Sequence, residues 1–323
     1  MYKYIGIDVS KQTFDVFGLS KEGVNLSLNL ANSLQGFKKL IRQYTVDRTY
    51  VMEASGPYYL QLASFLYASG ARVAVVNPLV IRRFSQMSLS RAKTDAKDAQ
   101  LIHQYANRHP VTLWKPENPL ILEMKQIITS LELLNRQLTA LKNQFGAFRD
   151  SGAISPAVHL GLSAAVEALE TQKSALEQAL KAIVTEHFFE TKRLLESIPG
   201  IGPKTSALLI AITGNFERFE HPKQLIAYVG LSPRVYQSGT SVKGKGHICK
   251  MGSAQVRKHL YLCAWSAKWH NTPCKNLYKR LEANGKPERV IKIAIANKLL
   301  RQAFAVAISG KEFDENYGLK GAA

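Results

Sequence analysis

The sequence predicts an α/β domain followed by a mainly helical half, and three of its features support this prediction. Short β-rich runs alternate with amphipathic helices through roughly the first 110 residues. Apolar residues in the middle then recur at alternating steps of four and three, as they do along paired long helices. The last third contains a glycine-rich turn between helical runs and a strongly basic tract. We therefore expect three regions, residues 1–112, 113–192 and 193–323.

The first region begins with three adjacent strand-like runs and continues with strands and helices in alternation. That order of elements is typical of a ribonuclease-H-like sheet. The dipeptide Asn77-Pro78 closes the last strand. The expected strands are Tyr4–Val9, Thr13–Leu19, Val24–Leu30, Thr49–Ala54 and Ala71–Val76, and the expected helices are Ser33–Tyr44 and Pro57–Ala68.

Four acidic residues of this region are candidates for one shared site. Asp8 and Glu53 each end an expected strand, and neighbouring strand ends would project both carboxylates from the same edge of a sheet. Asp95 and Asp98 are three residues apart in a segment that continues as a helix through Tyr105, so both can face one side. Four carboxylates would then converge.

A cluster of this kind repels itself unless cations neutralise it, and Mg²⁺ prefers carboxylate oxygen. We expect Mg²⁺ as the cofactor, with Mn²⁺ as a substitute. Two such ions about 3.5–4 Å apart stabilise the attacking and leaving oxygens of phosphodiester exchange. Singly, the acids have ordinary explanations: a turn for Asp8, a helix cap for Asp95 and a solvated helix face for Asp98. Together, beside a basic half that can hold DNA, they favour a metal site.

The middle region predicts two long helices. A break at Ser151-Gly152 and Pro156 separates two apolar seams with heptad spacing. The helices would form an antiparallel hairpin or pair between subunits, and heptads cannot choose between these options. The first seam is Leu120, Met124, Ile127, Leu131, Leu134, Leu138, Leu141, Phe145 and Phe148, and the second is Leu162, Val166, Leu169, Leu176, Leu180 and Ile183.

A glycine-rich turn at Ile198–Thr205 opens the third region and leads into an apolar helical run, Ser206–Ile212. This pattern is typical of a helix-hairpin-helix. In that motif Gly200 and Gly202 would let backbone N–H groups approach a DNA phosphate, and Lys204 would add charge. The alternative is a tight turn between helices that needs glycine for its backbone angles.

The charge of the chain points to a polyanionic partner. The formal net charge is +19, and residues 233–301 hold fifteen lysines and arginines against two acids. We expect this segment to contact phosphates, although a generally basic, soluble surface would also account for charge alone. The expected nucleic-acid-binding residues are Gly200, Gly202, Lys204, Arg234, Lys243, Lys245, Lys250, Arg257 and Lys258.

Residues 232–247 read as a loop rich in glycine, hydroxyl groups and lysine, which could bind phosphate. One of its hydroxyls could equally be a nucleophile if a metal ion or a base activated it, because a free hydroxyl is weak. The spacing does not choose among Ser238, Thr240 and Ser241.

A stripe of aromatic residues, Tyr261, Trp265 and Trp269, recurs at every fourth position of an expected helix further on. Such a stripe usually packs in a core, so we expect these rings to be buried. The alternative is that they stack on unpaired bases.

Composition excludes several classes of protein. No run approaches the roughly 20 uninterrupted apolar residues of a membrane-spanning helix, and the N-terminus lacks the pattern of a signal peptide, so we expect a cytoplasmic protein without a membrane partner. The three cysteines, Cys249, Cys263 and Cys274, form no disulfide framework and lack a paired zinc motif.

Taken in order, these motifs resemble the DEDD transposases of insertion sequence family 110, which include the Piv-type DNA invertases. The resemblance spans nearly the whole chain, and although each motif is weak alone, all five in this order are specific. The motifs are Tyr4–Asp8, Glu53–Tyr58, Lys93–Ala99, Ile198–Gly202, and Gly230–Arg234 leading to Ser238–Ser241.

The resemblance implies a RuvC-like N-terminal domain with Asp8, Glu53, Asp95 and Asp98 as its DEDD acids, then a coiled coil and a C-terminal transposase domain. It also implies that Ser238 is the nucleophile, giving a covalent phosphoserine intermediate that a second DNA strand resolves. Acids and serine would form one composite site. The coiled coil would let them come from different subunits of a dimer or tetramer.

Members of this family are also similar in using a structured "bridge" RNA whose loops pair with target and donor DNA. The implied partners are therefore target DNA, donor DNA and a bridge RNA, whereas a Piv-type invertase need not use a guide. The sequence departs conservatively at Thr240, where a serine would also suit a hydroxyl loop.

Two other functions compete with a recombinase. A sugar-kinase or actin-like ATPase also begins with Gly-Ile-Asp on its first strand. Here, however, the following segment Asp8–Thr13 lacks the glycine that lets backbone approach a nucleotide phosphate. A structural DNA-binding protein would keep the hairpin and the basic tract without needing the acids.

Overall fold

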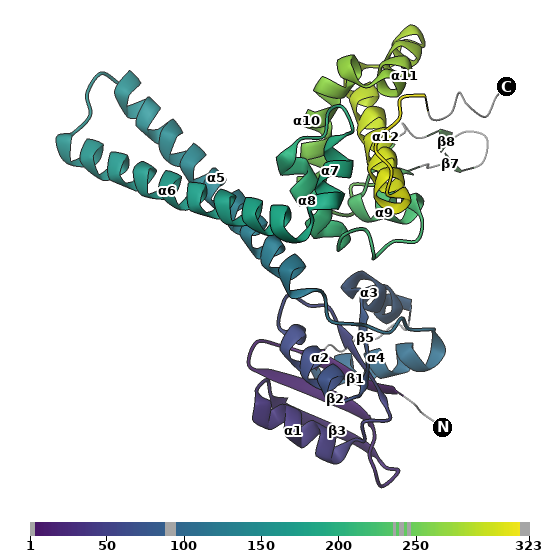
Figure 1. Ribbon diagram of the computed structural model, residues 1–323. Coiled ribbons are helices and arrows are strands. Elements are labelled where there is room, and N and C mark those ends of the chain that lie inside the picture. The colour runs from purple at the N-terminus through teal and green to yellow at the C-terminus, as the bar shows by residue number, and fades with distance from the viewer. Residues whose placement is uncertain (1–3, 88–94, 235–236, 239–241, 244–246, 317–323) are drawn as a thin grey trace, which may run out of the picture. The chain divides into compact units, whose positions relative to one another are not determined.

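The structure, a computed structural model, describes residues 4–87, 95–234, 237–238, 242–243 and 247–316. The chain divides into two compact units, Met1–Pro116 and Glu117–Ala323. The first unit holds a mixed sheet with helices, and the second is mostly helical (Figure 1). The prediction of an α/β part followed by a mainly helical part is confirmed.

The sheet of the first unit has the strand order β3-β2-β1-β4-β5. Strand β1 pairs antiparallel with β2 and parallel with β4, so the first three strands form a meander and the last two are reached by helical crossovers. The elements are β1 (Tyr4–Val9), β2 (Thr13–Leu19), β3 (Asn25–Ala31), α1 (Leu34–Gln43), β4 (Thr49–Glu53), α2 (Tyr59–Ala68), β5 (Arg72–Val76), α3 (Pro78–Met87) and α4 (Asp95–Arg108).

Helix α3 was not predicted from the sequence. Asn77-Pro78 reads as a stop after the strand, but proline is also well tolerated in the first turn of a helix. The side chain of Asn77 accepts a hydrogen bond from the backbone N–H of Leu79 at 2.9 Å, which caps the start of the helix. Ile81 and Phe84 then bury their side chains beneath it.

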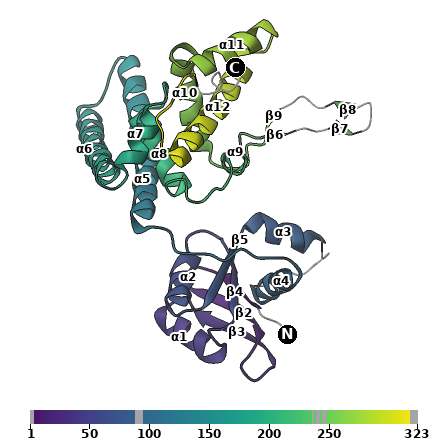
Figure 2. The ribbon, with the colours of Figure 1, turned by 45° about the vertical axis from the view of Figure 1, so that its right-hand side comes forward.

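Helices cover both faces of the sheet. Figure 2 shows α1 and α2 on one face and α3 and α4 on the other. Side chains alternate along β1, and Ile5, Ile7 and Val9 pack under α1 and α2. The opposite face packs Val51 and Ala74 against α3 and α4. Gly6 and Asp8 therefore point toward the face that α4 covers.

Helix α4 lies directly on the backbone of β1 because Gly6 has no side chain. A Cβ at Gly6 would stand 2.5 Å from the backbone nitrogen of His103 and would also collide with the carbonyl oxygen of Ala99. The imidazole of His103 is buried, and its Nδ1 donates to the carbonyl oxygen of Tyr4 at 2.9 Å. Burial lowers the pKa of His103, which favours the neutral ring, whose Nε2 can accept a hydrogen bond from Asn107.

Gly6→Ala should therefore destabilise the first unit, because the added methyl meets backbone atoms that cannot turn away. We expect a loss of at least about 1–3 kcal/mol of unfolding free energy, measured by denaturant titration. Gly146→Ala is the matched control, since a Cβ in that helix interior would meet nothing within 4 Å in the described chain. That variant should gain about 0.5–1 kcal/mol. Equal stability of Gly6→Ala and the wild type would contradict the close contact.

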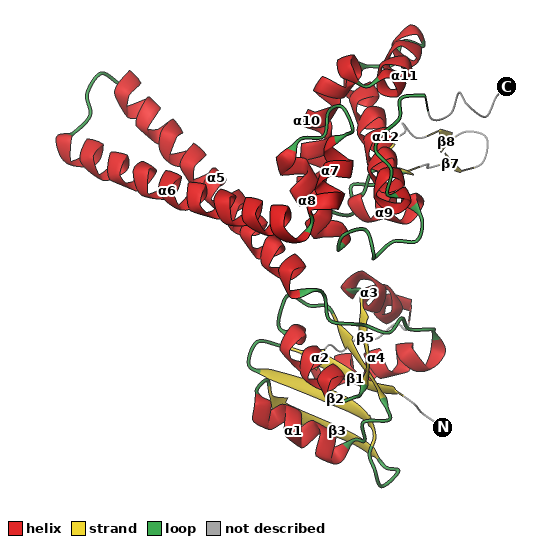
Figure 3. Ribbon diagram, in the orientation of Figure 1, coloured by secondary structure: helices red, strands yellow, loops and turns green. Residues whose placement is uncertain are grey.

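The second unit begins with two long helices that pack against each other within the chain, as Figure 3 shows. Lys142 and Glu170 form an ion pair across the two helices at 2.6 Å, and the rings of Phe145 and His159 lie 5.1 Å apart near the turn. Of the two predicted arrangements, the hairpin is therefore present in a single chain. These helices are α5 (Pro119–Asp150) and α6 (Pro156–His187).

Among the described residues, six further helices and four short strands complete the second unit. Helices α7, α8, α9, α10 and α12 pack around one apolar core, and α5 contributes Ile121, Met124 and Ile128 to it. The elements are α7 (Phe189–Glu196), α8 (Pro203–Thr213), α9 (Pro222–Val229), β6 (Pro233–Arg234), β7 (Gln237–Ser238), β8 (Val242–Lys243), β9 (His247–Ile248), α10 (Ala254–His270), α11 (Thr272–Ala283) and α12 (Glu288–Ser309). In the part of the chain that the structure describes, no helix is both long and apolar enough to span a membrane.

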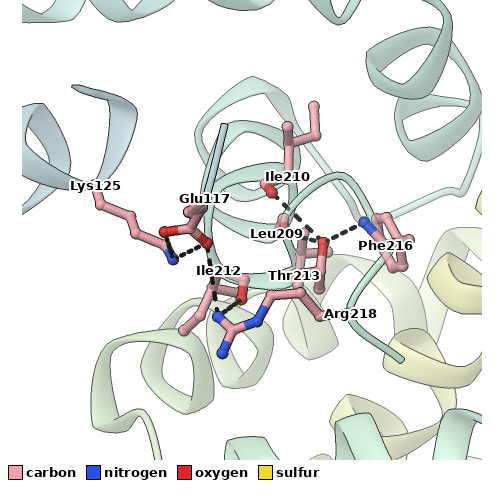
Figure 4. A network of polar contacts seen from close by, with 8 residues as sticks. All are labelled: Glu117, Lys125, Leu209, Ile210, Ile212, Thr213, Phe216 and Arg218. Atoms are coloured by element: carbon pink, nitrogen blue, oxygen red, sulfur yellow. Dashed lines mark hydrogen bonds and ion pairs between the residues drawn. The ribbon is translucent and has the colours of Figure 1, made fainter. Parts of the chain in front are cut away.

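A polar network ties the start of α5 to the end of α8 (Figure 4). The carboxylate of Glu117 accepts a hydrogen bond from Lys125 at 2.7 Å and lies 3.8 Å from the guanidinium of Arg218. The hydroxyl of Thr213 donates to the carbonyl of Leu209 and accepts from the N–H of Phe216, which stabilises the turn after α8. The network holds the long helices to the C-terminal core.

Candidate catalytic acids and nucleic-acid interface

Two of the four predicted acids lie at the same end of the sheet and on the same face. The parallel register pairs Ile7 with Met52, so Asp8 and Glu53 follow as neighbours on adjacent strands. Asp8 is two residues beyond Gly6 and shares its face, which α4 covers. Both acids are partly exposed, and Glu53 accepts a hydrogen bond from the hydroxyl of Ser55 at 2.6 Å. The structure therefore brings these two acids together at adjacent strand ends.

Helix α4 runs antiparallel to β1, which directs its first turn toward Asp8. His103 contacts Tyr4 through a hydrogen bond, and Ala99, one helical turn earlier, lies against Gly6. Four strand residues rise about 13 Å, and eight helical residues rise about 12 Å. The backbone of Asp95 therefore reaches the level of Asp8, and Asp98 is partly buried within the first turn of α4.

Carboxylates are the donors that this corner of the sheet offers to a cation. Asp8 and Glu53 place two carboxylates on one face of the sheet, and Asp98 lies in the first turn of the helix that covers this face. Carboxylate oxygens are the ligands that Mg²⁺ prefers. Among the described side chains, no three acidic, histidine or cysteine residues already stand close enough to hold a metal ion. The side chain of Asp95, the fourth predicted ligand, lies outside the described atoms.

A fifth acid, Asp15, stands directly opposite Asp8 on β2, and sequence reasoning missed it. The residue is only 9% exposed, and its carboxylate accepts a hydrogen bond from the side-chain amide of Asn29 at 2.9 Å. Asp15 therefore brings a further carboxyl group next to Asp8. The available signal was an aspartate at a buried position of a strand, between Phe14 and Val16.

Residues 232–247 were predicted to be a loop, but four two-residue strands lie within residues 233–248. Strand β6 pairs with β9, which sets Arg234 opposite His247, and β7 pairs with β8, which sets Ser238 opposite Val242. Strands this short leave almost no alternating pattern, so the sequence does not reveal them. The side chains of Ser238 and Lys243 lie outside the described atoms, and Thr240, Ser241 and Lys245 lie outside the described residues.

The predicted helix-hairpin-helix has two differently placed glycines. Gly200 has a φ of +105°, and a Cβ there would stand 2.8 Å from that of Ala267 on α10, so this glycine serves the turn and the packing. Gly202 caps α8, and a Cβ there would meet nothing within 4 Å among the described atoms, which leaves the N-terminus of the helix open. The ammonium of Lys204 lies 2.8 Å from Glu177 in an exposed ion pair. Such a pair is weak and can exchange for a phosphate.

Lys204 and Lys258 line the same groove, between the long helices and the helices α8 and α10. Arg136 and Lys181, on the long helices, also line it, and sequence reasoning missed both because it looked for charge in the last third only. Burial, followed by the charge of Lys258, lowers the pKa of His259 in this groove. The groove therefore brings together cations from α5, α6, α8 and α10. The full lining is Ile128, Leu131, Glu132, Asn135, Arg136, Thr139, Glu177, Leu180, Lys181, Val184, Lys192, Pro203, Lys204, Ala207, Leu208, Gln255, Lys258 and His259.

Three further predicted phosphate contacts, Arg234, Lys250 and Arg257, are not among the residues that line this groove. The guanidinium of Arg257 donates to the carbonyl oxygen of Val229 at 2.8 Å, so it stabilises the end of α9. Arg234 and Lys250 are exposed, and Lys250 has a left-handed backbone with a φ of +58°.

Comparison with known proteins finds matches to two transposase family models that together span most of the chain. One family model, described as "Transposase", matches residues 5–150, and a second, described as "Transposase IS116/IS110/IS902 family", matches residues 192–279. The first match contains all four predicted acids, and the second contains the glycine-rich turn and Ser238.

Relatives of similar length match nearly end to end. The pilin gene-inverting protein of Moraxella lacunata is 29% identical over 97% of this chain and 98% of its own. The transposase for insertion sequence element IS1328 of Yersinia enterocolitica is 25% identical over 96% of this chain and 98% of its own. The transposase for insertion sequence element IS1111A of Coxiella burnetii is 23% identical over 92% of this chain and 87% of its own. These matches favour a recombinase over an ATPase.

Proposed function

Because this chain belongs to the IS110 family of transposases, we propose that it cuts and rejoins DNA through a phosphoserine intermediate, using Asp8, Glu53, Asp95, Asp98 and Ser238. The observation that supports this most is the position of Asp8 and Glu53 on the sheet face that receives the first turn of α4. The strand order β3-β2-β1-β4-β5 supports a RuvC-like assignment of the first unit.

In the proposed reaction the hydroxyl oxygen of Ser238 forms a bond to a DNA phosphorus, and the bond from that phosphorus to a deoxyribose oxygen breaks. The serine proton leaves to a base, and the departing oxygen takes up a proton. A hydroxyl of a second strand then gives up its proton and bonds to the phosphorus of the phosphoserine, the bond between that phosphorus and the Ser238 oxygen breaks, and the serine oxygen takes up a proton. Mg²⁺, held by the carboxylates, would stabilise the attacking and leaving oxygens. Asp15, opposite Asp8, would add another carboxyl oxygen of the kind that Mg²⁺ prefers.

The proposed assembly is a dimer or tetramer with target and donor DNA as substrates. Its support is the apolar surface left on the long helices, where Leu133, Phe148, Val158 and Leu160 are exposed. A second copy would cover these side chains. Acids and serine of different subunits could then act on one phosphate.

A bridge RNA is the proposed guide, and a guide-free invertase is the second candidate, favoured by the match to the pilin gene-inverting protein. The deciding experiment expresses the protein with the flanking noncoding sequence of its own element and sequences the RNA that copurifies. A single structured RNA from that flank supports the guided reaction. Mixed cellular RNA alone favours the invertase and leaves the proposed chemistry unchanged.

Nucleic-acid affinity should fall steeply with salt, because the basic segment and the groove are proposed to contact phosphates. Six to ten phosphate contacts would cost about 10³–10⁵-fold in affinity between about 50 and 200 mM salt. Fluorescence anisotropy of a labelled duplex measures this slope. Lys258→Gln should reduce the slope by about one contact, whereas Lys21→Gln, an exposed lysine of the first unit, should leave it unchanged. A flat response to salt would rule out the phosphate interface.

A further inference from the structure

Two of the three rings in the aromatic stripe on α10 are exposed, contrary to the prediction that the stripe packs in the core, and the third, Tyr261, is half-buried. Trp265 and Trp269 are 49% and 63% exposed. The core-facing side of α10 is instead made of Val256, Leu260, Ala264 and Ala267. Two exposed indoles about one helical turn apart present apolar surface on a helix of the basic segment.

Two buried lysines lie behind these rings. The ammonium of Lys292 is 3.0 Å from the centroid of the Trp265 ring, and that of Lys268 is 5.0 Å from the centroid of Trp269. Both lysine side chains are at least nine-tenths buried and share a single carboxylate, Glu288. The indole faces therefore complete the stabilisation of two cations that one acid cannot neutralise.

The arrangement fixes the rings and leaves ring surface open. An ammonium lies against each indole from inside the protein, so the exposed surface is flat and apolar, with two lysines and one carboxylate behind it. A nucleobase has a flat π-face that can stack on the indole, and the phosphate next to it is attracted by the positive charge. Bases of a duplex are already stacked on each other, so the occupant must be unpaired. The surrounding segment has more basic than acidic residues, which also favours a negatively charged partner.

We propose that Trp265 and Trp269, with Lys268 and Lys292 behind them, form a stacking platform for unpaired DNA bases. The proposal rests on the recombinase function, because strand exchange releases cut DNA strands from their duplex and exposes their bases. The platform would hold such a strand while its end waits for rejoining. It assigns α10 a binding role that is separate from the acids and from Ser238.

Tryptophan fluorescence tests this proposal directly, because the chain has only three tryptophans. The third, Trp114, lies in the first unit against Tyr67, and Trp114→Phe removes its signal conservatively. Titrating the full-length Trp114→Phe protein with single-stranded oligothymidylate should quench most of the remaining emission. A duplex of equal length should quench little, even at concentrations where anisotropy shows it to be bound.

The double variant Trp265→Ala/Trp269→Ala, made in the otherwise unchanged chain, supplies a second measurement. Its affinity for single-stranded DNA should fall on the order of 10-fold or more, while its affinity for duplex DNA changes less than about 3-fold. Phe189→Ala is the matched control, because Phe189 is another exposed ring of the second unit, on α7. It should leave both affinities unchanged.

Other outcomes would overturn the platform. One is single-stranded DNA that binds by anisotropy without quenching, and another is an equal loss of single-stranded and duplex affinity in the double variant. Quenching by oligouridylate but not by oligothymidylate would assign the surface to RNA. Self-association that shields the tryptophans, and that the double variant abolishes, would make the surface a contact between copies of this chain.

The Asp8→Asn protein separates this test from the proposed function. It should lack recombination yet show the same quenching, because Asp8 lies in the other unit. In the Trp114→Phe protein, which keeps Asp8, absence of quenching together with intact recombination would contradict the platform alone. Retained quenching together with full recombination by Asp8→Asn would contradict the proposed catalytic site alone.

Discussion

Asp8→Asn should abolish strand exchange while the protein still binds DNA. The substitution keeps the shape of the side chain but removes the charge that faces Glu53 and the first turn of α4. Removing one group that stabilises transition-state charge typically costs about 10²–10³-fold in rate. A plasmid recombination assay, with binding measured by anisotropy on the same preparation, checks both halves of the prediction.

Controls for this variant come from the same unit. Glu53→Gln should behave like Asp8→Asn, because the two acids are neighbours on adjacent strands. Glu22→Gln removes an exposed acid in the turn after β2, at the opposite end of that strand from Asp15, and should keep full activity. Unfolding curves of all three must match the wild type, so that lost activity is not lost structure. Normal recombination by Asp8→Asn would contradict the metal-site hypothesis.

The acids at the strand ends could be predicted because strand ends are local features of the sequence. Asp8 and Glu53 each close a run of β-forming residues, and parallel strands align their ends without further information. The approach of α4 is different, because it depends on what lies above Gly6. A glycine within a strand gives only a hint of close backbone contact, and it does not identify the partner. The position of the Asp95 backbone near Asp8 therefore came from the structure.

The residues that sequence reasoning misjudged depend on tertiary neighbours. Asp15 lies beside the site because antiparallel pairing sets it opposite Asp8, and the sequence of either strand alone does not determine that register. Trp265 and Trp269 were expected in the core, but the small side chains of Ala264 and Ala267 let other helices approach the opposite side of α10. Helical periodicity identifies a stripe and does not say which stripe is buried.

The hydroxyl that attacks DNA remains a prediction from family resemblance, together with the three-region division of the chain and the guide RNA. The backbone of Ser238 lies in β7, opposite Val242 in β8. Gly239 and the two competing hydroxyl residues, Thr240 and Ser241, lie between these strands and outside the described residues. Experiments that detect the covalent adduct are therefore needed to identify which of the three hydroxyls attacks DNA.

Ser238→Ala should eliminate the covalent protein–DNA species and reduce strand exchange by about 10⁴–10⁶-fold, the cost of deleting an enzymatic nucleophile. No other group can replace the bond between the serine oxygen and the phosphorus. A labelled DNA substrate with a nick beside the cleavage position should trap the intermediate. Denaturing gels then reveal it as labelled protein, and peptide mass spectrometry locates the modified residue.

Ser241→Ala is the matched control, because it removes the same hydroxyl three positions away and should still form the adduct. An adduct that survives in Ser238→Ala but disappears in Ser241→Ala would move the nucleophile within the same segment. Asp8→Asn adds a further distinction, since it should also fail to form the adduct while keeping Ser238. Exchange lost in Asp8→Asn but retained in Ser238→Ala would mean that the acids act without a protein nucleophile, as they do when DNA ends attack directly.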